Sequence, residues 1–108
     1  MKRLKYYYLY VLSVAILVLI GGCAKNIVDT SSLYTPTTAN VTANATLQEL
    51  QQGRALYINN CNSCHGLVSP DNYTALEWKN ILGMMAPRTS MSTSEIQLVT
   101  KYLCKGNQ

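Results

Sequence analysis

With 108 residues and a formal net charge of +4, the chain has room for no more than one small domain. Three of its nine Lys and Arg residues fall within the first five positions, so the chain after residue 22 carries six Lys and Arg against five Asp and Glu. Such a nearly neutral chain offers no basic surface for nucleic acid, and we exclude that class of partner.

Residues 1–22 have the features of a secretory signal. Lys2, Arg3 and Lys5 give a positively charged start, and residues 6–20 form an apolar run that is short for a membrane span. Because a signal of this kind is a targeting device, we exclude these residues from the fold. The alternative is an uncleaved signal anchor with a buried cysteine.

Cys23 directly follows the expected signal, at the end of the sequence Ile-Gly-Gly-Cys. This sequence resembles the lipobox that the bacterial lipoprotein peptidase cuts, which implies that Cys23 becomes the acylated first residue of the mature chain. The expected location is therefore the bacterial cell envelope, with the protein lipid-anchored and facing the periplasm. Ala24 after the cysteine, in place of Asp, resembles the sorting of some lipoproteins to the outer membrane.

Residues 23–45 are rich in Thr, Ser, Asn and Ala and contain few large apolar side chains. A segment of this composition buries too little apolar surface to offset its chain entropy. The sequence therefore predicts a flexible tether over these residues, joining the lipidated cysteine to a folded domain at residues 46–108.

The expected domain contains three capping boxes, in which a hydroxyl residue is followed three positions later by Glu. The boxes pair Thr46 with Glu49, Thr74 with Glu77 and Ser92 with Glu95. They predict an all-α fold of three helices: one over residues 47–59, one that ends before Pro87, and one that ends near Cys104 with Gly106 as its cap.

A Cys-x-x-Cys-His motif follows the first expected helix, where residues 61–65 read Cys-Asn-Ser-Cys-His. Two cysteines in this spacing bind a c-type haem through thioether bonds, and the following histidine ligates the iron. Cys61 and Cys64 are thus the candidate attachment sites of one covalent haem c, and His65 is a candidate axial ligand. A redox dithiol would prefer a strand before the motif, and a zinc site would need further ligands downstream.

The second axial ligand is sought among the methionines, since a thioether ligand raises the potential of the iron. Met85 shares the helical phase of Trp78 and Leu82 and is therefore expected on the buried face, whereas Met84 lies about a third of a turn away. Met85 is the first candidate and Met84 the second. Met91 also has an ordinary role as the apolar residue that precedes the third helix.

Other side chains near the motif have expected supporting roles. His65 should donate its second ring N–H to a loop carbonyl near Ser69 or Pro70. Three side chains are candidate donors to the haem propionates, with simple packing as the alternative for the first two: Tyr73, Trp78 and Arg88.

With these residues in place, the segment 46–106 resembles the small monohaem class I c-type cytochromes. The resemblance implies a compact all-α domain of three helices around one covalent haem, acting as an electron carrier and not as an enzyme. In that family a glycine and an aromatic residue of the first helix pack across the last helix, and Gly53 and Tyr57 match that pattern. Cys104 has no place in the pattern and either packs in the core or forms an intermolecular disulfide.

The resemblance also implies the kind of partner: redox proteins such as membrane complexes or reductases, with no small-molecule substrate. Two alternatives stay open. The protein could be a haem-based gas-binding or sensor protein with a weak or absent methionine ligand, or an electron-entry subunit of a larger oxidoreductase. Since about 60 residues form only a marginal core, we expect the domain to require its haem for folding.

Overall fold

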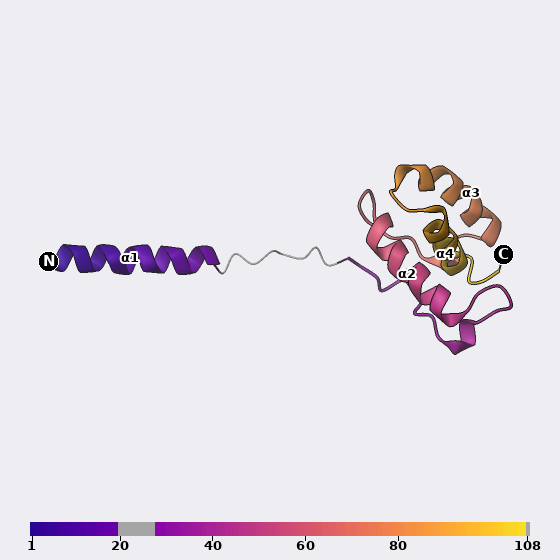
Figure 1. Ribbon diagram of the computed structural model, residues 1–108, viewed down its shortest axis with the longest axis horizontal. Coiled ribbons are helices and arrows are strands. Elements are labelled where there is room, and N and C mark those ends of the chain that lie inside the picture. Colours follow the sequence, from indigo (N-terminus) through magenta and orange to yellow (C-terminus); the bar gives the residue numbers. More distant parts are fainter. Residues whose placement is uncertain (20–27, 108) are drawn as a thin grey trace.

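The computed structural model describes residues 1–19 and 28–107, and its regular structure is helical, with one isolated β-bridge between Thr42 and Ala45 (Figure 1). Its α-helices are α1 (Lys2–Leu19), α2 (Leu47–Cys61), α3 (Ala75–Met85) and α4 (Thr93–Leu103). Three short 3₁₀ turns accompany them: η1 (Thr38–Asn40), η2 (Pro70–Asn72) and η3 (Ala86–Arg88). The all-helical architecture confirms the predicted fold class.

α1 covers most of the segment expected to be a secretory signal. Its basic start is followed by apolar and tyrosine side chains that are exposed, with Tyr6 at 72% and Leu12 at 63%. In the parts of the chain that the structure describes, no helix is both long enough and apolar enough to cross a membrane. Cys23 and the expected cleavage site lie outside the described residues.

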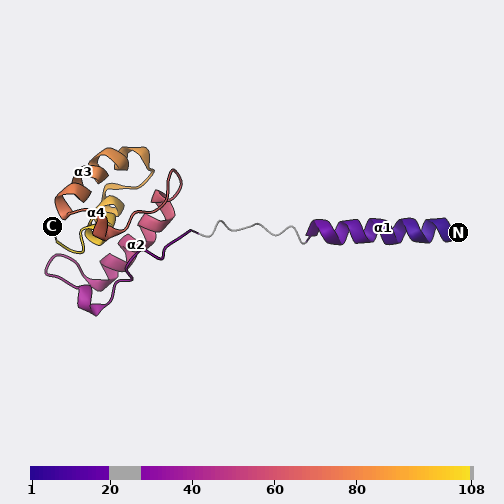
Figure 2. The same ribbon diagram turned by 180° about the vertical axis from the view of Figure 1, so that it is seen from behind.

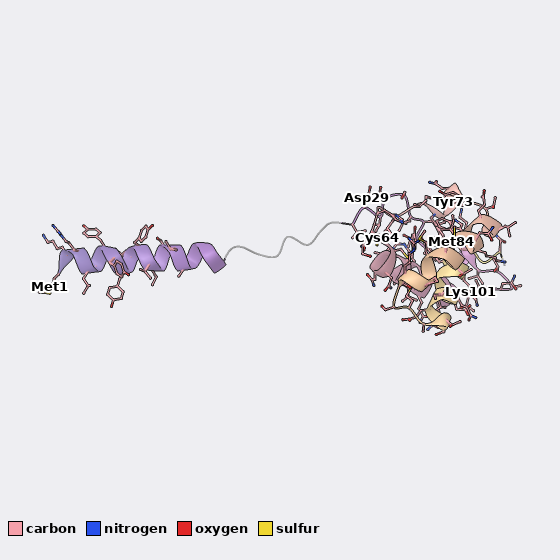
Figure 3. All side chains as sticks on the ribbon, turned by 90° about the horizontal axis from the view of Figure 1, so that it is seen from above. Met1, Asp29, Cys64, Tyr73, Met84 and Lys101 are labelled. Carbon is pink, nitrogen blue, oxygen red and sulfur yellow. The ribbon has the colours of Figure 1, made fainter. Side chains whose placement is uncertain are left out.

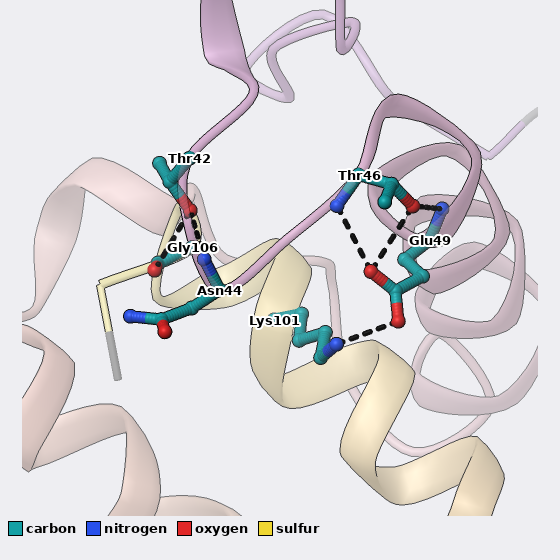
Figure 4. A network of polar contacts seen from close by, with 6 residues as sticks. All are labelled: Thr42, Asn44, Thr46, Glu49, Lys101 and Gly106. Carbon is teal, nitrogen blue, oxygen red and sulfur yellow. Dashed lines mark hydrogen bonds and ion pairs between the residues drawn. The ribbon is translucent and has the colours of Figure 1, made fainter.

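Each helix of the folded domain begins where its capping box predicts. Thr46, Thr74 and Ser92 are the N-caps: each hydroxyl accepts the backbone N–H of the Glu three residues later, and that Glu side chain accepts the N–H of the cap. Figure 4 shows the box at the start of α2. These local contacts fix the helix starts independently of the rest of the fold. α2 is longer than predicted and continues to Cys61, so the helix extends into the cysteine motif.

α2 and α4 pack directly against each other, as both views of the ribbon show (Figures 1 and 2). A Cβ atom on Gly53 would overlap the carbonyl oxygen of Leu98 and would lie 2.9 Å from the Cβ of Tyr102. The close crossing therefore depends on a residue without a side chain. This explains why α2 tolerates an interior glycine, which costs about 1 kcal/mol relative to alanine, and it confirms the expected role of Gly53.

The core lies among α2, α3, α4 and a segment that precedes α2. Its most deeply buried apolar side chains are Leu33, Ala45, Leu50, Tyr57, Trp78, Leu82, Val99, Tyr102, Leu103 and Cys104. Cys104 is 4% exposed and its thiol donates to the carbonyl oxygen of Ala75, with 3.5 Å between the two atoms. Cys104 therefore fills the core as a small apolar residue, the first of the two roles considered for it.

The segment before α2 corrects the predicted domain boundary. Leu33 and Ala45 are 6% and 2% exposed, and the ring of Tyr34 stacks on that of Tyr102 with 4.7 Å between centroids. We call residues 33–45 the strap. The expected flexible tether over residues 23–45 is wrong for the strap, because Leu33 is buried in the core and Tyr34 stacks on Tyr102 of α4 even though the overall composition is polar.

Polar contacts hold both ends of the strap on the domain. The Tyr34 hydroxyl donates to the carbonyl oxygen of Tyr102 at 2.8 Å, and the Tyr102 hydroxyl donates to that of Tyr34 at 3.0 Å. Arg54 Nε donates to the same Tyr34 oxygen at 3.1 Å. Near the other end, the Thr42 hydroxyl donates to the carbonyl oxygen of Gly106 at 3.1 Å (Figure 4). The folded domain therefore begins before residue 46.

Glu49 links the start of α2 to α4 and should make stability depend on pH. Lys101 Nζ lies 2.6 Å from Glu49 Oε1, while the N–H and hydroxyl of Thr46 donate to Oε2 (Figure 4). These contacts, with that of Lys101 the largest, lower the pKa of Glu49 to about 2. Because the unfolded chain has a higher pKa, near 4.5, the contribution is complete above that pH and is lost as the pH falls towards 2.

We therefore expect the free energy of unfolding to decrease between pH 4.5 and pH 2, and Glu49→Gln to reduce this dependence. Chemical denaturation at a series of pH values measures it. Glu77→Gln is the matched control, since Glu77 makes the same capping contacts but forms no ion pair with a lysine within the described residues, and its effect should be smaller. Equal effects of the two substitutions would show that the pair with Lys101 contributes nothing.

Candidate haem-attachment site

The cysteine motif lies at the C-terminal end of α2. Cys61 is the last helical residue and is half-buried, while Cys64 and His65 are exposed in the turn that follows. Both cysteines are free thiols, and burial raises the pKa of the Cys61 thiol. Two free thiols in this spacing, followed by an imidazole, form the donor set that a thioether-bound haem requires. The residues present therefore fit the cofactor that the sequence predicts.

The ring of His65 is oriented by its own neighbour. Its Nδ1 lies 2.8 Å from the carbonyl oxygen of Gly66, and because a carbonyl only accepts, Nδ1 carries the proton. Nε2 is then left as the nitrogen that can ligate iron. The acceptor is therefore the Gly66 carbonyl and not, as expected, one near Ser69 or Pro70. The Pro70 carbonyl instead accepts the indole N–H of Trp78 at 3.0 Å.

Tyr57 fixes the loop that follows the motif. Its hydroxyl donates to the carbonyl oxygen of Val68 at 2.9 Å and accepts the N–H of the same residue at 3.0 Å. Burial raises the pKa of this hydroxyl, which keeps it protonated and able to donate. The resemblance predicts only packing for Tyr57. Its role in hydrogen-bonding the loop could have been predicted from the residue type, since a phenylalanine would pack equally well but has no hydroxyl to bind Val68.

Two further contacts fix the same loop. Trp78, which is 3% exposed, packs edge-to-face against Tyr73 with 5.1 Å between ring centroids, and this contact confirms the packing role considered for both. Lys105 forms an ion pair with Asp71 in η2 and so connects the loop to the turn after α4.

The indole N–H of Trp78 donates to the loop carbonyl of Pro70, so the prediction that this N–H binds a propionate is wrong. Arg88, the third candidate, is exposed.

The methionines differ in their surroundings. Met91 is partly buried against the core, in agreement with its ordinary packing role. Met84 and Met85 close α3 and are 61% and 37% exposed. Met85 shares the phase of buried Leu82 but lies at the helix end, where the core contacts stop, and it is therefore not buried as expected. It remains the less exposed of the two candidate ligands.

A hollow of about 580 Å³ lies beside the motif. It is lined by the two residues between the cysteines, by the loop after His65 and by the chain just before the strap: Val28, Asp29, Ser32, Asn62, Ser63, Gly66 and Leu67. Figure 3 shows Asp29 and Cys64 on the same side of the domain. Within residues 1–19 and 28–107, no group of three or more His, Cys, Asp and Glu side chains could hold a metal ion, so the rival zinc site has no ligand set there.

Two curated proteins are similar to part of this chain. It is 38% identical over 53 residues to the cytochrome c-type protein TorY of Haemophilus influenzae, and 40% identical over 42 residues to the cytochrome c-type protein TorY of Escherichia coli O157:H7. The aligned segments cover 49% and 39% of this chain but only 14% and 12% of those proteins. No family model and no solved structure matches the chain. Together with the donor set at residues 61–65, these relatives support a c-type cytochrome.

Proposed function

We propose that the protein is a monohaem c-type cytochrome that carries electrons while tethered to the bacterial cell envelope. The observation that carries this proposal is the arrangement at the end of α2: two free thiols, Cys61 and Cys64, followed by His65 with its Nε2 left free by the contact to Gly66. The similarity to two proteins named as c-type cytochromes supports it. When bound, the haem supplies an iron that takes up and releases one electron.

The chain's own residues then have distinct roles. Cys61 and Cys64 would hold the haem covalently, and His65, whose ring is oriented by Gly66, would bind its iron. Met85 would supply the second ligand, because it is the less exposed of the two methionines that close α3 and has the helical phase of the core residues. Tyr57 holds the loop after the motif in place. The proposed role is therefore electron transfer without catalysis.

We further propose that residues 1–22 direct export and that Cys23 is acylated, with the domain on the periplasmic side. The basic start and the Ile-Gly-Gly-Cys sequence support this. The partners are then redox proteins, either membrane complexes or reductases. Labelling growing cells with radioactive palmitate tests the anchor: the protein should carry label, and Cys23→Ser should carry none. A labelled Cys23→Ser variant would contradict acylation at Cys23.

The ligand assignment is tested by absorption spectroscopy of the purified, haem-loaded protein. We expect the ferric protein to show the weak near-infrared band of methionine-to-iron coordination. Met85→Ala should abolish the band and lower the reduction potential, because a soft thioether favours ferrous iron. Met84→Ala is the matched control and should retain the band. Loss of the band in Met84→Ala alone would assign the ligand to Met84 instead.

The same spectra separate the electron carrier from a gas-binding protein. A parent protein with the methionine band has no free position on the iron, and we expect it not to bind carbon monoxide readily when reduced. A parent that lacks the band and binds carbon monoxide would contradict the electron-carrier proposal and favour a sensor.

A further inference from the structure

The strap shortens the connection between the proposed lipid anchor and the folded domain. Among the described residues from 28 onward, Leu33 is the first that is buried, and its N–H donates to the carbonyl oxygen of Thr30 at 3.0 Å. Only residues 24–32 therefore separate Cys23 from the domain. Since an extended chain spans at most about 3.5 Å per residue, Leu33 stays within about 35 Å of Cys23, and Val28 within about 18 Å.

The chain joins the domain on the side of the cysteine motif. Val28, Asp29 and Ser32 line the hollow that they share with Asn62 and Ser63, the two residues between the cysteines. Asp29 and Cys64 lie on the same side of the domain in Figure 3. The shortest path from the anchor therefore leads to the part of the domain that holds the haem.

The contacts of Tyr34 keep this connection short. Its ring stacks on Tyr102 and lies under the Lys105 ammonium, which is 5.6 Å from the ring centroid. Its hydroxyl and carbonyl oxygen bind Tyr102, and the carbonyl oxygen also accepts from Arg54. Releasing the strap would break all of these contacts together. The strap therefore cannot serve as extra tether length while the domain is folded.

We propose that this short connection holds the Cys-x-x-Cys-His side of the domain at the membrane surface, and that its electron partner is a redox protein embedded in that same membrane. The inference rests on the proposed acylation of Cys23. Confinement to a layer a few nanometres deep raises the effective concentration of such a partner without any new contact. A tether reaching to residue 45 would instead allow the haem to sample a much larger volume.

The first test measures how close the haem lies to lipid headgroups. Full-length, acylated, haem-loaded protein is incorporated into vesicles of phosphatidylethanolamine and phosphatidylglycerol that contain a headgroup-labelled fluorescent lipid, which the haem quenches by energy transfer. In one variant, 20 Gly and Ser residues are inserted between Asn26 and Ile27, adding about 25 Å of average reach. The control carries the same insertion after Gln108.

We expect the parent and the control to quench equally, and the variant lengthened after Asn26 to quench at least two-fold less. Equal quenching by all three proteins would overturn the proposal, because the motif side would then not depend on the short connection. Haem absorption and palmitate labelling of each purified protein are checked beforehand. Failure of the proposed cytochrome function or of acylation would therefore be detected separately.

The second test addresses the partner. Membranes of the producing bacterium are mixed and fused with vesicles that carry each protein, and NADH is added as the electron source. The reduction of the haem is then followed by its absorption. We expect the parent and the control to be reduced at the same rate and the lengthened variant to be reduced several-fold more slowly, while dithionite reduces all three equally. A parent that these membranes do not reduce, or a lengthened variant reduced as fast as the parent, would rule out a partner confined to the membrane.

Discussion

Replacing both motif cysteines, in the variant Cys61→Ser/Cys64→Ser, is expected to abolish covalent haem attachment and cooperative folding. The substitution removes both thioether bonds, and a domain of this size has too small a core to lose its largest apolar group. Haem-dependent peroxidase staining after denaturing electrophoresis should find no haem in the protein band. Thermal melts followed by circular dichroism should show no cooperative transition.

Cys104→Ala is the control for this experiment, because Cys104 is also a free thiol but is buried away from the motif. It should keep its covalent haem and lose only about 1 kcal/mol of stability, as expected for a small truncation in a core. Haem that stays bound to the double variant under denaturing conditions would contradict attachment at residues 61 and 64. A haem-free double variant that melts cooperatively would contradict the dependence of folding on haem.

The second large effect is expected at the crossing of α2 and α4. Gly53→Ala should destabilise the protein by about 3 kcal/mol, since a Cβ atom there overlaps the backbone of Leu98, which cannot move without displacing α4. Urea denaturation of the haem-loaded protein measures the change. The effect should appear as a lower midpoint with an unchanged slope.

Gly83→Ala is the matched control because Gly83 is exposed in α3 and a Cβ atom there meets nothing within 4 Å. This variant should gain about 1 kcal/mol from the better helix propensity of alanine. The two substitutions are chemically identical, so opposite signs can only come from the surroundings. A shift in the same direction for both would refute the close helix crossing.

The helices were predictable because their signals are local. Each capping box needs only residues three positions apart, and the structure places Thr46, Thr74 and Ser92 at the three N-caps. The strap was not predictable in this way. Tyr34 is held by Tyr102, 68 positions later, and composition gives no information about a partner so far along the chain.

The candidate site also has one part that local sequence predicts and another that depends on the folded backbone. The positions of Cys61, Cys64 and His65 follow from one short motif, and the structure places them together at the end of α2. The orientation of His65 and the anchoring of the loop depend on which carbonyls the folded loop presents. The acceptors are the carbonyl of Gly66 for His65 and that of Val68 for Tyr57. Their positions depend on the path of the loop backbone, which no local pattern predicts.

The pairing of the strap with the C-terminal end also orders events during synthesis. Tyr34 binds Tyr102, and Thr42 binds Gly106, so these contacts cannot form until residues 102 and 106 have been made. The Cys-x-x-Cys-His motif is complete well before that point. A chain made from its N-terminus therefore exposes both thiols before these long-range contacts can form, so covalent modification of residues 61 and 64 can precede closure of the domain.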